Sequence, residues 1–319
     1  MQIGSGRAGL RRRAVCGKAG GPHHGDHMSR PLHVAFHVGV HATDGDHLWR
    51  SLAQNAAALR AQGCELCENA INEPILNEAL ATLKGGTASA EMEEVILDAL
   101  VEGEQTRRLI MSRPSFLGVP SGALSVEGMM PYAGNKMLGL ANTLPNAQAE
   151  FFMGLKNPVT LINQLVARNP AHNAPLAARH DPMGRRWAPT LRHAVQALRG
   201  RRLVVWCHED MPLIYPEVLR RLAGVEADMP LKGDMRLLDG LLTEAGVQAL
   251  RAGLVPDMGS DARRTLIETV LAAHVRPERL RAEITVPDWT PELVAGMTEA
   301  YHRDIAEIAA LPGVEFIAA

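Results

Sequence analysis

The chain has 319 residues, of which 46% are hydrophobic, so it can bury a sizeable core in one large domain or two smaller ones. A formal net charge of −2 and an aromatic content of 4% argue against a nucleic-acid-binding surface. No apolar run approaches the roughly 18 residues of a membrane-spanning helix. Four cysteines are too few for a disulfide framework. We therefore expect a soluble, cytoplasmic α/β protein without nucleic-acid or membrane partners.

Residues 1–30 differ in composition from the rest of the chain. They are rich in Gly and carry six basic residues against one acid, Asp26. The basic run is not followed by the continuous apolar stretch of a signal peptide. We expect either a disordered basic arm or a start assigned upstream of a natural one at Met28. Residues 31–319 are then expected to form a single α/β domain.

Strand and helix patterns alternate after residue 30. Alternating apolar side chains predict a first strand over 32–40, and a helix follows with Leu48 and Leu52 on one face and ends near Gly63. Further strands are predicted over 108–111, 149–155, 202–207 and 314–317. Helices are predicted over 92–106, 135–143, 189–198, 216–222, 243–252 and 291–310. This alternation indicates a parallel sheet between helical layers, with ligands bound beyond the carboxyl ends of the strands.

Two segments between these elements bear on function. The stretch 167–189 is rich in Pro, Arg and His without a clean period, and is interpreted as a lid or substrate loop, or as a plain surface excursion. The segment after the first strand reads Gly39-Val40-His41-Ala42-Thr43-Asp44-Gly45-Asp46-His47. A strand, loop and helix in this order present backbone N–H groups and a helix N-terminus to an anion. It is not a Walker A loop, because no Gly-Lys-Ser/Thr follows.

Three segments resemble bacterial sulfotransferase-family proteins, in the family's order and across roughly residues 32–225. HVGVHATDGDHLWRSLAQNAAALRAQG is similar to the family's opening strand, which leads into H-K-T-G-T-T and a helix. EFFMGLKNPVTLINQLV resembles its strand ending in Arg-Asp-Pro, and LVVWCHEDMPLIYPEVLRRLAGV its next strand. The resemblance implies a P-loop NTPase-like fold of the sulfotransferase type, with three α/β/α layers. It also implies sulfuryl transfer from 3′-phosphoadenosine 5′-phosphosulfate to a hydroxyl of a carbohydrate or small molecule.

The resemblance also implies roles for individual residues. Lys156 takes the position of the family's Arg, and Gln164 that of a Ser eight residues on. The cofactor-binding residues would be Gly39, His41, Thr43, Gly45, Lys156 and Gln164. His41 and Glu209 would be catalytic, with Glu209 as a general base for the acceptor hydroxyl.

Departures from the family pattern support a second hypothesis. Ala42 stands where the family has Lys, and Asp44 and Asp46 place carboxylates where an anion would bind. Loss of the Lys removes charge-assisted hydrogen bonds of roughly 1.5–3 kcal/mol each. The pattern therefore also fits a catalytically inactive protein of the same fold that binds another ligand or a protein partner.

A metal site is a third and weaker hypothesis. His41, Asp44, Asp46 and His47 are ligand types that Zn or Mn sites use, but Asp44 and Asp46 are more simply explained as acids at a helix start. We expect no metal cofactor. Cys64 and Cys67 form a single C-x-x-C pair after a helix, which indicates buried or edge-strand cysteines rather than a redox site. The sequence indicates no oligomeric state.

Overall fold

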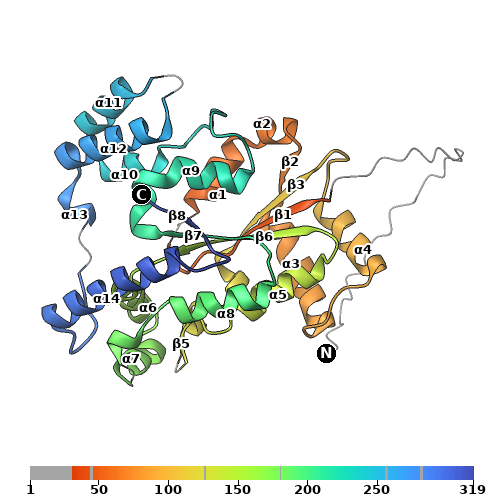
Figure 1. Ribbon diagram of the computed structural model, residues 1–319, viewed down its shortest axis with the longest axis horizontal. Helices are drawn as coiled ribbons and strands as arrows, with labels where there is room; N and C mark the ends of the chain where they lie inside the picture. The colour runs from red at the N-terminus through yellow and green to blue at the C-terminus, as the bar shows by residue number, and fades with distance from the viewer. Residues whose placement is uncertain (1–30, 44–45, 126, 180, 256–257, 281–282) are drawn as a thin grey trace, which may run out of the picture. The chain divides into compact units, whose positions relative to one another are not determined.

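Six parallel strands form the central sheet of the protein, which is described from a computed structural model (Figure 1). Their spatial order is β2 (Cys64–Leu66), β3 (Arg108–Ser112), β1 (His33–His37), β6 (Gln148–Leu155), β7 (Leu203–Cys207) and β8 (Glu315–Ile317). Each neighbouring pair runs parallel. The predicted α/β class with a central parallel sheet is therefore confirmed.

The structure describes residues 31–319 except 44–45, 126, 180, 256–257 and 281–282. Pro31–Ala319 form one compact unit. The expectations for residues 1–30, and those for Asp44 and Gly45, lie outside the described residues. None of the helices in the described part combines the length and apolar character needed to cross a membrane.

Strand β1 occupies the middle of the sheet because apolar side chains cover both of its faces. Val34 pairs in register with Leu109 of β3 and with Ala149 of β6. Phe36 is fully buried on one face and stacks on Phe151 with ring centroids 5.4 Å apart. Continuous burial of this kind is what a strand covered by helices on both sides requires.

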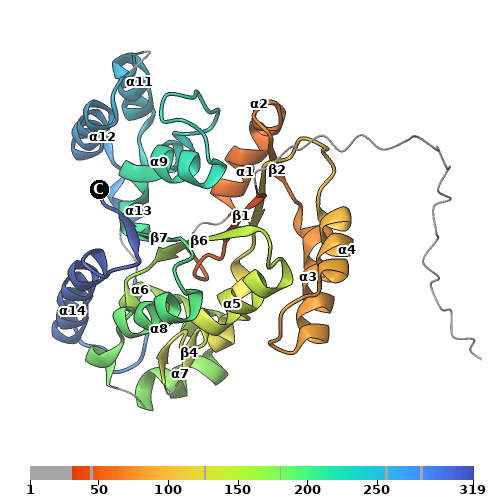
Figure 2. The ribbon, with the colours of Figure 1, turned by 45° about the vertical axis from the view of Figure 1, so that its right-hand side comes forward.

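Helices cover both faces of the sheet, so the predicted three-layer α/β/α arrangement is confirmed (Figures 1 and 2). One layer contains α1 (His47–Gln54), α2 (Ala56–Ala61) and α9 (Met211–Ala223), packed on the sheet face that includes Ala35. The opposite layer contains α3 (Asn69–Leu83), α4 (Ala90–Leu100), α5 (Ala133–Thr143), α6 (Pro158–Arg168), α7 (Pro170–Arg179), α8 (Ala188–Leu198) and α14 (Pro291–Ala309). Each layer buries its own apolar cluster against the sheet.

Four further helices follow α9, and the first three of them contribute to a smaller apolar cluster around Leu242 and Ile267. They are α10 (Arg236–Leu241), α11 (Glu244–Gly253), α12 (Ser260–His274) and α13 (Pro277–Leu280). The remaining elements are a hairpin of β4 (Leu124–Ser125) and β5 (Gly128–Met129), and the 3-10 turns η1 (Pro114–Leu117), η2 (Pro120–Gly122), η3 (Pro182–Gly184) and η4 (His208–Asp210). The hairpin is a separate two-stranded sheet.

Most predicted elements are present, with three differences. The first strand ends at His37 rather than at residue 40, because Gly39 turns the chain with a φ of 67°. The helix predicted over 92–106 ends at Leu100. The stretch 167–189, expected to be irregular, contains α7 and η3, and its Trp187 is fully buried. Packing against the core, rather than a local apolar period, orders this stretch.

A buried ion-pair cluster holds the amino ends of the central strands together. The Glu150 carboxylate accepts hydrogen bonds from Arg108 at 2.8 Å and from His33 Nδ1 at 3.0 Å. Arg202 lies 3.4 Å from the same carboxylate. Burial alone would raise the pKa of Glu150, but the charge of Arg108 and these hydrogen bonds outweigh it and hold the pKa below its ordinary value. The cluster therefore stabilises the fold most when Glu150 is ionised.

We expect Glu150→Gln to lower the free energy of unfolding by about 2 kcal/mol at pH 7, because Arg108 stays buried opposite a neutral amide. Since the folded-state pKa of Glu150 is lowered, its contribution is present above pH 4.5 and is lost as the pH falls below that value. Urea unfolding at pH 7 and pH 3.5 measures both effects. A difference between variant and wild type that is as large at pH 3.5 as at pH 7 would contradict this assignment.

Candidate functional site

The candidate site lies at the carboxyl edge of the sheet, where the loops that follow β1, β6 and β7 meet. From β1 the chain runs to β2 and β3 on one side of that strand, and afterwards to β6, β7 and β8 on the other. The crevice at such a reversal is where parallel α/β sheets bind ligands. The three segments that carry the sequence resemblance follow these three strands, so the fold brings them to one place.

Lys156 connects two of these segments. Its side chain is buried, and Nζ donates to the Ala42 carbonyl at 2.7 Å and to Gln164 Oε1 at 3.0 Å. Burial lowers the pKa of Lys156, an effect that Glu209 partly opposes. Among the described residues, no ion pair includes Lys156. The ammonium group is therefore desolvated, and its hydrogen bonds within the described part of the chain go to neutral oxygens.

The loop after β1 is folded on itself. Thr43 Oγ1 donates to the Val40 carbonyl at 2.6 Å, and Gly39 lies against Pro114. A Cβ at position 39 would come 3.3 Å from the Pro114 Cα, and the positive φ there favours glycine. Asp46 occupies the N-cap position of α1 in a left-handed conformation but makes no side-chain cap hydrogen bond. Asp46 therefore stands at the predicted N-cap position but does not make a capping hydrogen bond.

His41 is buried beside the segment that follows η1. The backbone of Gly118 and Val119 supports one ring nitrogen, whereas Nε2 is buried with no hydrogen-bond partner among the described residues. Burial is the main cause of its lowered pKa, and the positive charges of Arg168 and Lys136 add to it. The ring is therefore neutral near pH 7, and its Nε2 keeps no partner among the described residues.

Glu209 in η4 forms hydrogen bonds to the residue that follows Lys156 and to helix α14. Its Oε1 accepts from the Asn157 backbone N–H at 2.8 Å, and its Oε2 accepts from the Tyr301 hydroxyl at 3.0 Å. Burial and the neighbouring Glu209 raise the pKa of Tyr301, so this phenol stays protonated and donates. Both carboxylate oxygens of Glu209 are therefore already hydrogen-bonded to other groups of the protein. Tyr301 was not identified from the sequence, because it comes from α14, 92 residues further along the chain.

Two groups next to Glu209, His208 and Cys207, are neutral near pH 7, and burial raises the pKa of the third, Asp210. Burial lowers the pKa of His208 to about 4, with a further contribution from Lys156. Burial raises the pKa of the Cys207 thiol to about 12, which makes it a poor nucleophile.

The C-x-x-C pair lies away from these residues. Cys64 belongs to the edge strand β2, as the sequence suggested, and both thiols are buried and free. Burial raises the pKa of Cys67 to about 11. The described residues contain no group of three or more His, Cys, Asp or Glu side chains that could hold a metal ion. Asp44, one of the four residues of the metal hypothesis, lies outside them.

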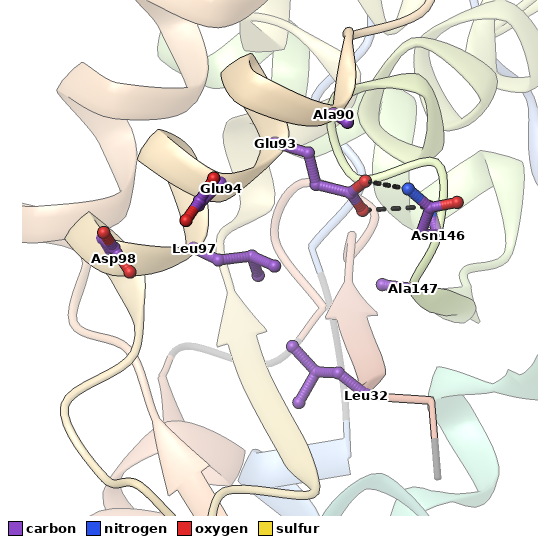
Figure 3. Close-up of a pocket in the computed structure, with 8 residues that line it drawn as sticks. All are labelled: Leu32, Ala90, Glu93, Glu94, Leu97, Asp98, Asn146 and Ala147. Atoms are coloured by element: carbon purple, nitrogen blue, oxygen red, sulfur yellow. Dashed lines mark hydrogen bonds between the residues drawn. The ribbon is translucent and has the colours of Figure 1, made fainter. Parts of the chain in front are cut away.

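A small cavity of about 370 Å³ lies at the opposite, amino end of the sheet (Figure 3). Figure 3 shows Glu93 of α4 directed at Asn146, whose backbone and side-chain nitrogens donate to it at 2.9 and 2.6 Å. Leu32, just before β1, lines the other side of the cavity. Glu93 fastens α4 to the turn before β6, which is a structural role.

The arrangement at the carboxyl edge combines a buried cation with the N-terminus of α1, and so can bind an anion. Comparison with known proteins adds no relative: no protein-family model matches the chain, and no curated protein matches it significantly.

Proposed function

We propose that the carboxyl edge binds the anionic groups of 3′-phosphoadenosine 5′-phosphosulfate and that the chain transfers the sulfuryl group to a hydroxyl of a carbohydrate or small molecule. The observation that carries this proposal is the buried ammonium group of Lys156, which bonds to neutral oxygens of Ala42 and Gln164 and to no carboxylate of the described residues. Each charge-assisted hydrogen bond to an anion there is worth roughly 1.5–3 kcal/mol. The contact between Lys156 and Gln164 also supports it, because the resemblance pairs these positions around one phosphate.

The proposed reaction assigns His41 to proton transfer. The acceptor oxygen forms a bond to sulfur while the bond between sulfur and the 5′-phosphate oxygen breaks, and the phosphate leaves with the electron pair. The hydroxyl proton passes to His41 Nε2, the ring nitrogen without a protein partner among the described residues. This nitrogen is buried, so the acceptor reaches it only after side chains of the loop move. Positioning and charge stabilisation supply most of the rate in such transfers.

Glu209 is proposed as a positioning residue rather than the general base that the sequence suggested. Its carboxylate already accepts from Asn157 N–H and from the Tyr301 hydroxyl. Through Asn157 it fixes the backbone directly after Lys156. We propose that this contact sets the direction of the Lys156 side chain toward Ala42 and Gln164.

In a second candidate function, the protein binds the same ligand but does not transfer the sulfuryl group. The loop supplies no cation of its own among its described residues: Ala42 offers a carbonyl to Lys156, and the Thr43 hydroxyl is already bonded to Val40. Without a charged group at the transferring sulfur, the nucleotide would bind without reacting. The protein would then act as an anion-binding module of the same architecture.

The first experiment is calorimetric titration with adenosine 3′,5′-bisphosphate, which carries the two phosphates and cannot react. We expect a micromolar dissociation constant that weakens by about 10- to 100-fold in Lys156→Met, since one or two charge-assisted hydrogen bonds are lost. Lys84→Met is the matched control, because Lys84 is exposed at the end of α3. No heat at millimolar ligand, or equal affinity in both variants, would overturn the proposed binding site.

A turnover assay then separates the two candidates. Release of adenosine 3′,5′-bisphosphate from the phosphosulfate donor, measured with a panel of hydroxyl acceptors, indicates transfer. In that case His41→Asn should abolish turnover and change the affinity for adenosine 3′,5′-bisphosphate by less than tenfold. Tight binding with no release for any acceptor supports the binding module instead.

A further inference from the structure

A cavity of about 920 Å³ lies between α9, α12 and the segment 225–234, apart from the candidate site. Its volume is within the range of roughly 300–1,000 Å³ that small-molecule sites occupy. Apolar side chains form part of the wall: Leu213, Pro216, Val225, Leu231 and Met258. A body of mainly hydrocarbon character would fit against them.

The rest of the lining is rich in arginine. Arg220, Arg221, Arg263 and Arg264 line the cavity, against three acids, Glu217, Asp228 and Asp234. Two of these acids each form ion pairs with two arginines. Asp234 lies 2.9 Å from Arg263 and 3.6 Å from Arg220, whereas Glu217 lies 2.5 Å from Arg264 and 3.0 Å from Arg221. Arg221 also pairs with Glu315, so each of the four arginines has a carboxylate partner among the described residues.

Two of the arginines keep donors available for a ligand. Arg263 bonds to Asp234 through one terminal nitrogen, and Arg264 bonds to Glu217 through one terminal nitrogen. Each guanidinium has five N–H groups, so most of them have no protein acceptor among the described residues. Both side chains are half-buried, which strengthens their interaction with an anion relative to a fully exposed pair.

Arg220 differs from Arg263 and Arg264, because its donors bond to backbone carbonyls in the wall of the cavity. It is buried and donates from Nε to the Met229 carbonyl at 3.1 Å and from Nη1 to the Pro216 carbonyl at 3.0 Å. The bond to Pro216 lies within α9, and the bond to Met229 fastens the segment 225–234 to this helix.

We propose that this cavity binds a small organic anion, with a carboxylate, phosphate or sulfate head at Arg263 and Arg264 and an apolar body on Leu213, Val225 and Leu231. Forked guanidinium donors match the planar or tetrahedral oxygens of such head groups. The site is independent of Lys156 and of the function proposed for the carboxyl edge.

Calorimetric titration of the full chain with octanoate, octyl phosphate and octyl sulfate, all below their micelle concentrations, tests the proposal. We expect saturable binding of at least one of them and at least tenfold weaker binding of octanol, which keeps the apolar body without the charge. The double variant Arg263→Gln/Arg264→Gln should weaken anion binding at least tenfold. Arg251→Gln, an exposed arginine of α11 outside the cavity, is the matched control and should bind as the wild type does.

A second variant covers the case in which the double variant does not fold. Val225→Phe fills part of the cavity and keeps every charge, and we expect it to weaken anion binding as well. Equal binding of octanol and octanoate would overturn the proposal, as would wild-type affinity in a folded Val225→Phe protein. Unchanged octanoate binding in Lys156→Met would show that the cavity, and not the carboxyl edge, holds the anion.

Discussion

Asp304→Ala is expected to lower the free energy of unfolding by about 4 kcal/mol, because it leaves several buried donors unpaired. Asp304 is 1% exposed. Its carboxylate accepts from the backbone N–H of Trp187 at 2.5 Å and from Arg186 Nε at 2.9 Å, and the Ala188 N–H lies 3.3 Å from both oxygens. The backbone N–H groups of Trp187 and Ala188 lie at the start of α8, and the residue at the N-cap position of α8 makes no side-chain capping bond. A residue of α14 thus caps α8.

Chemical denaturation at pH 7 measures this effect, with two further variants as controls. Asp304→Asn keeps an acceptor oxygen and should cost less than Asp304→Ala. Glu307→Ala removes a carboxylate one turn later on α14, which also pairs with Arg186 but is about one-third exposed. Partly exposed pairs contribute about 0.2–1 kcal/mol, so Glu307→Ala should be mild. Comparable losses in Asp304→Ala and Glu307→Ala would rule out the tertiary cap.

The same helix positions the candidate site. Tyr301 and Asp304 are three residues apart on α14 and so share a face. Tyr301 bonds to Glu209, which holds the Asn157 N–H, whereas Asp304 holds the N–H of Trp187, whose Nε1 donates to the Lys156 carbonyl at 2.9 Å. α14 therefore fixes the backbone on both sides of the Lys156 peptide. The proposed anion site and the stability of the carboxyl edge depend on one element.

The sequence predicted the layers of the fold because strong periodic signals determine them. Unbroken apolar runs marked β6 and β7, and alternation marked β1. It missed β2, a strand of three residues whose central Glu65 is buried and bonded to the backbone N–H groups of Glu102 and Gly103. It also missed α3, which contains Pro74. A buried acid and an internal proline both argue against regular structure locally, and only long-range contacts override them.

For the candidate site, the sequence located the parts but not their contacts. The family resemblance implied a common ligand for Lys156 and Gln164, and the two side chains are hydrogen-bonded. The roles of Tyr301 and Trp187 could not be anticipated, because neither lies near Lys156 in the chain. The contact of Lys156 with the Ala42 carbonyl depends on a left-handed residue, with φ of 61° at Ala42, which an alanine does not signal.

A loss of stability on mild acidification is the second large effect we expect, and His37 and His208 are its two largest sources. His37 is buried in the sheet, where Nδ1 is 2.7 Å from Ser112 Oγ and the ring stacks on Trp206. Burial lowers its pKa from 6.5 to about 4. Below pH 6.5 the unfolded chain therefore binds a proton that the folded chain refuses, so stability is complete above pH 6.5 and falls until about pH 4. This single group removes about 3 kcal/mol over that interval, and His208 adds in the same direction.

Urea unfolding at half-unit steps from pH 7 to pH 4.5 measures the slope. In His37→Leu the slope should fall by about 1.4 kcal/mol per pH unit near pH 5, the value for one proton, even though the variant is less stable overall. Ser112→Ala is the control, because it removes the hydroxyl partner and leaves the buried ring in place. We expect the two variants to differ in the slope of stability against pH, because burial and not the hydrogen bond excludes the proton from His37. An equal loss of slope in both variants would show that the hydrogen bond excludes it.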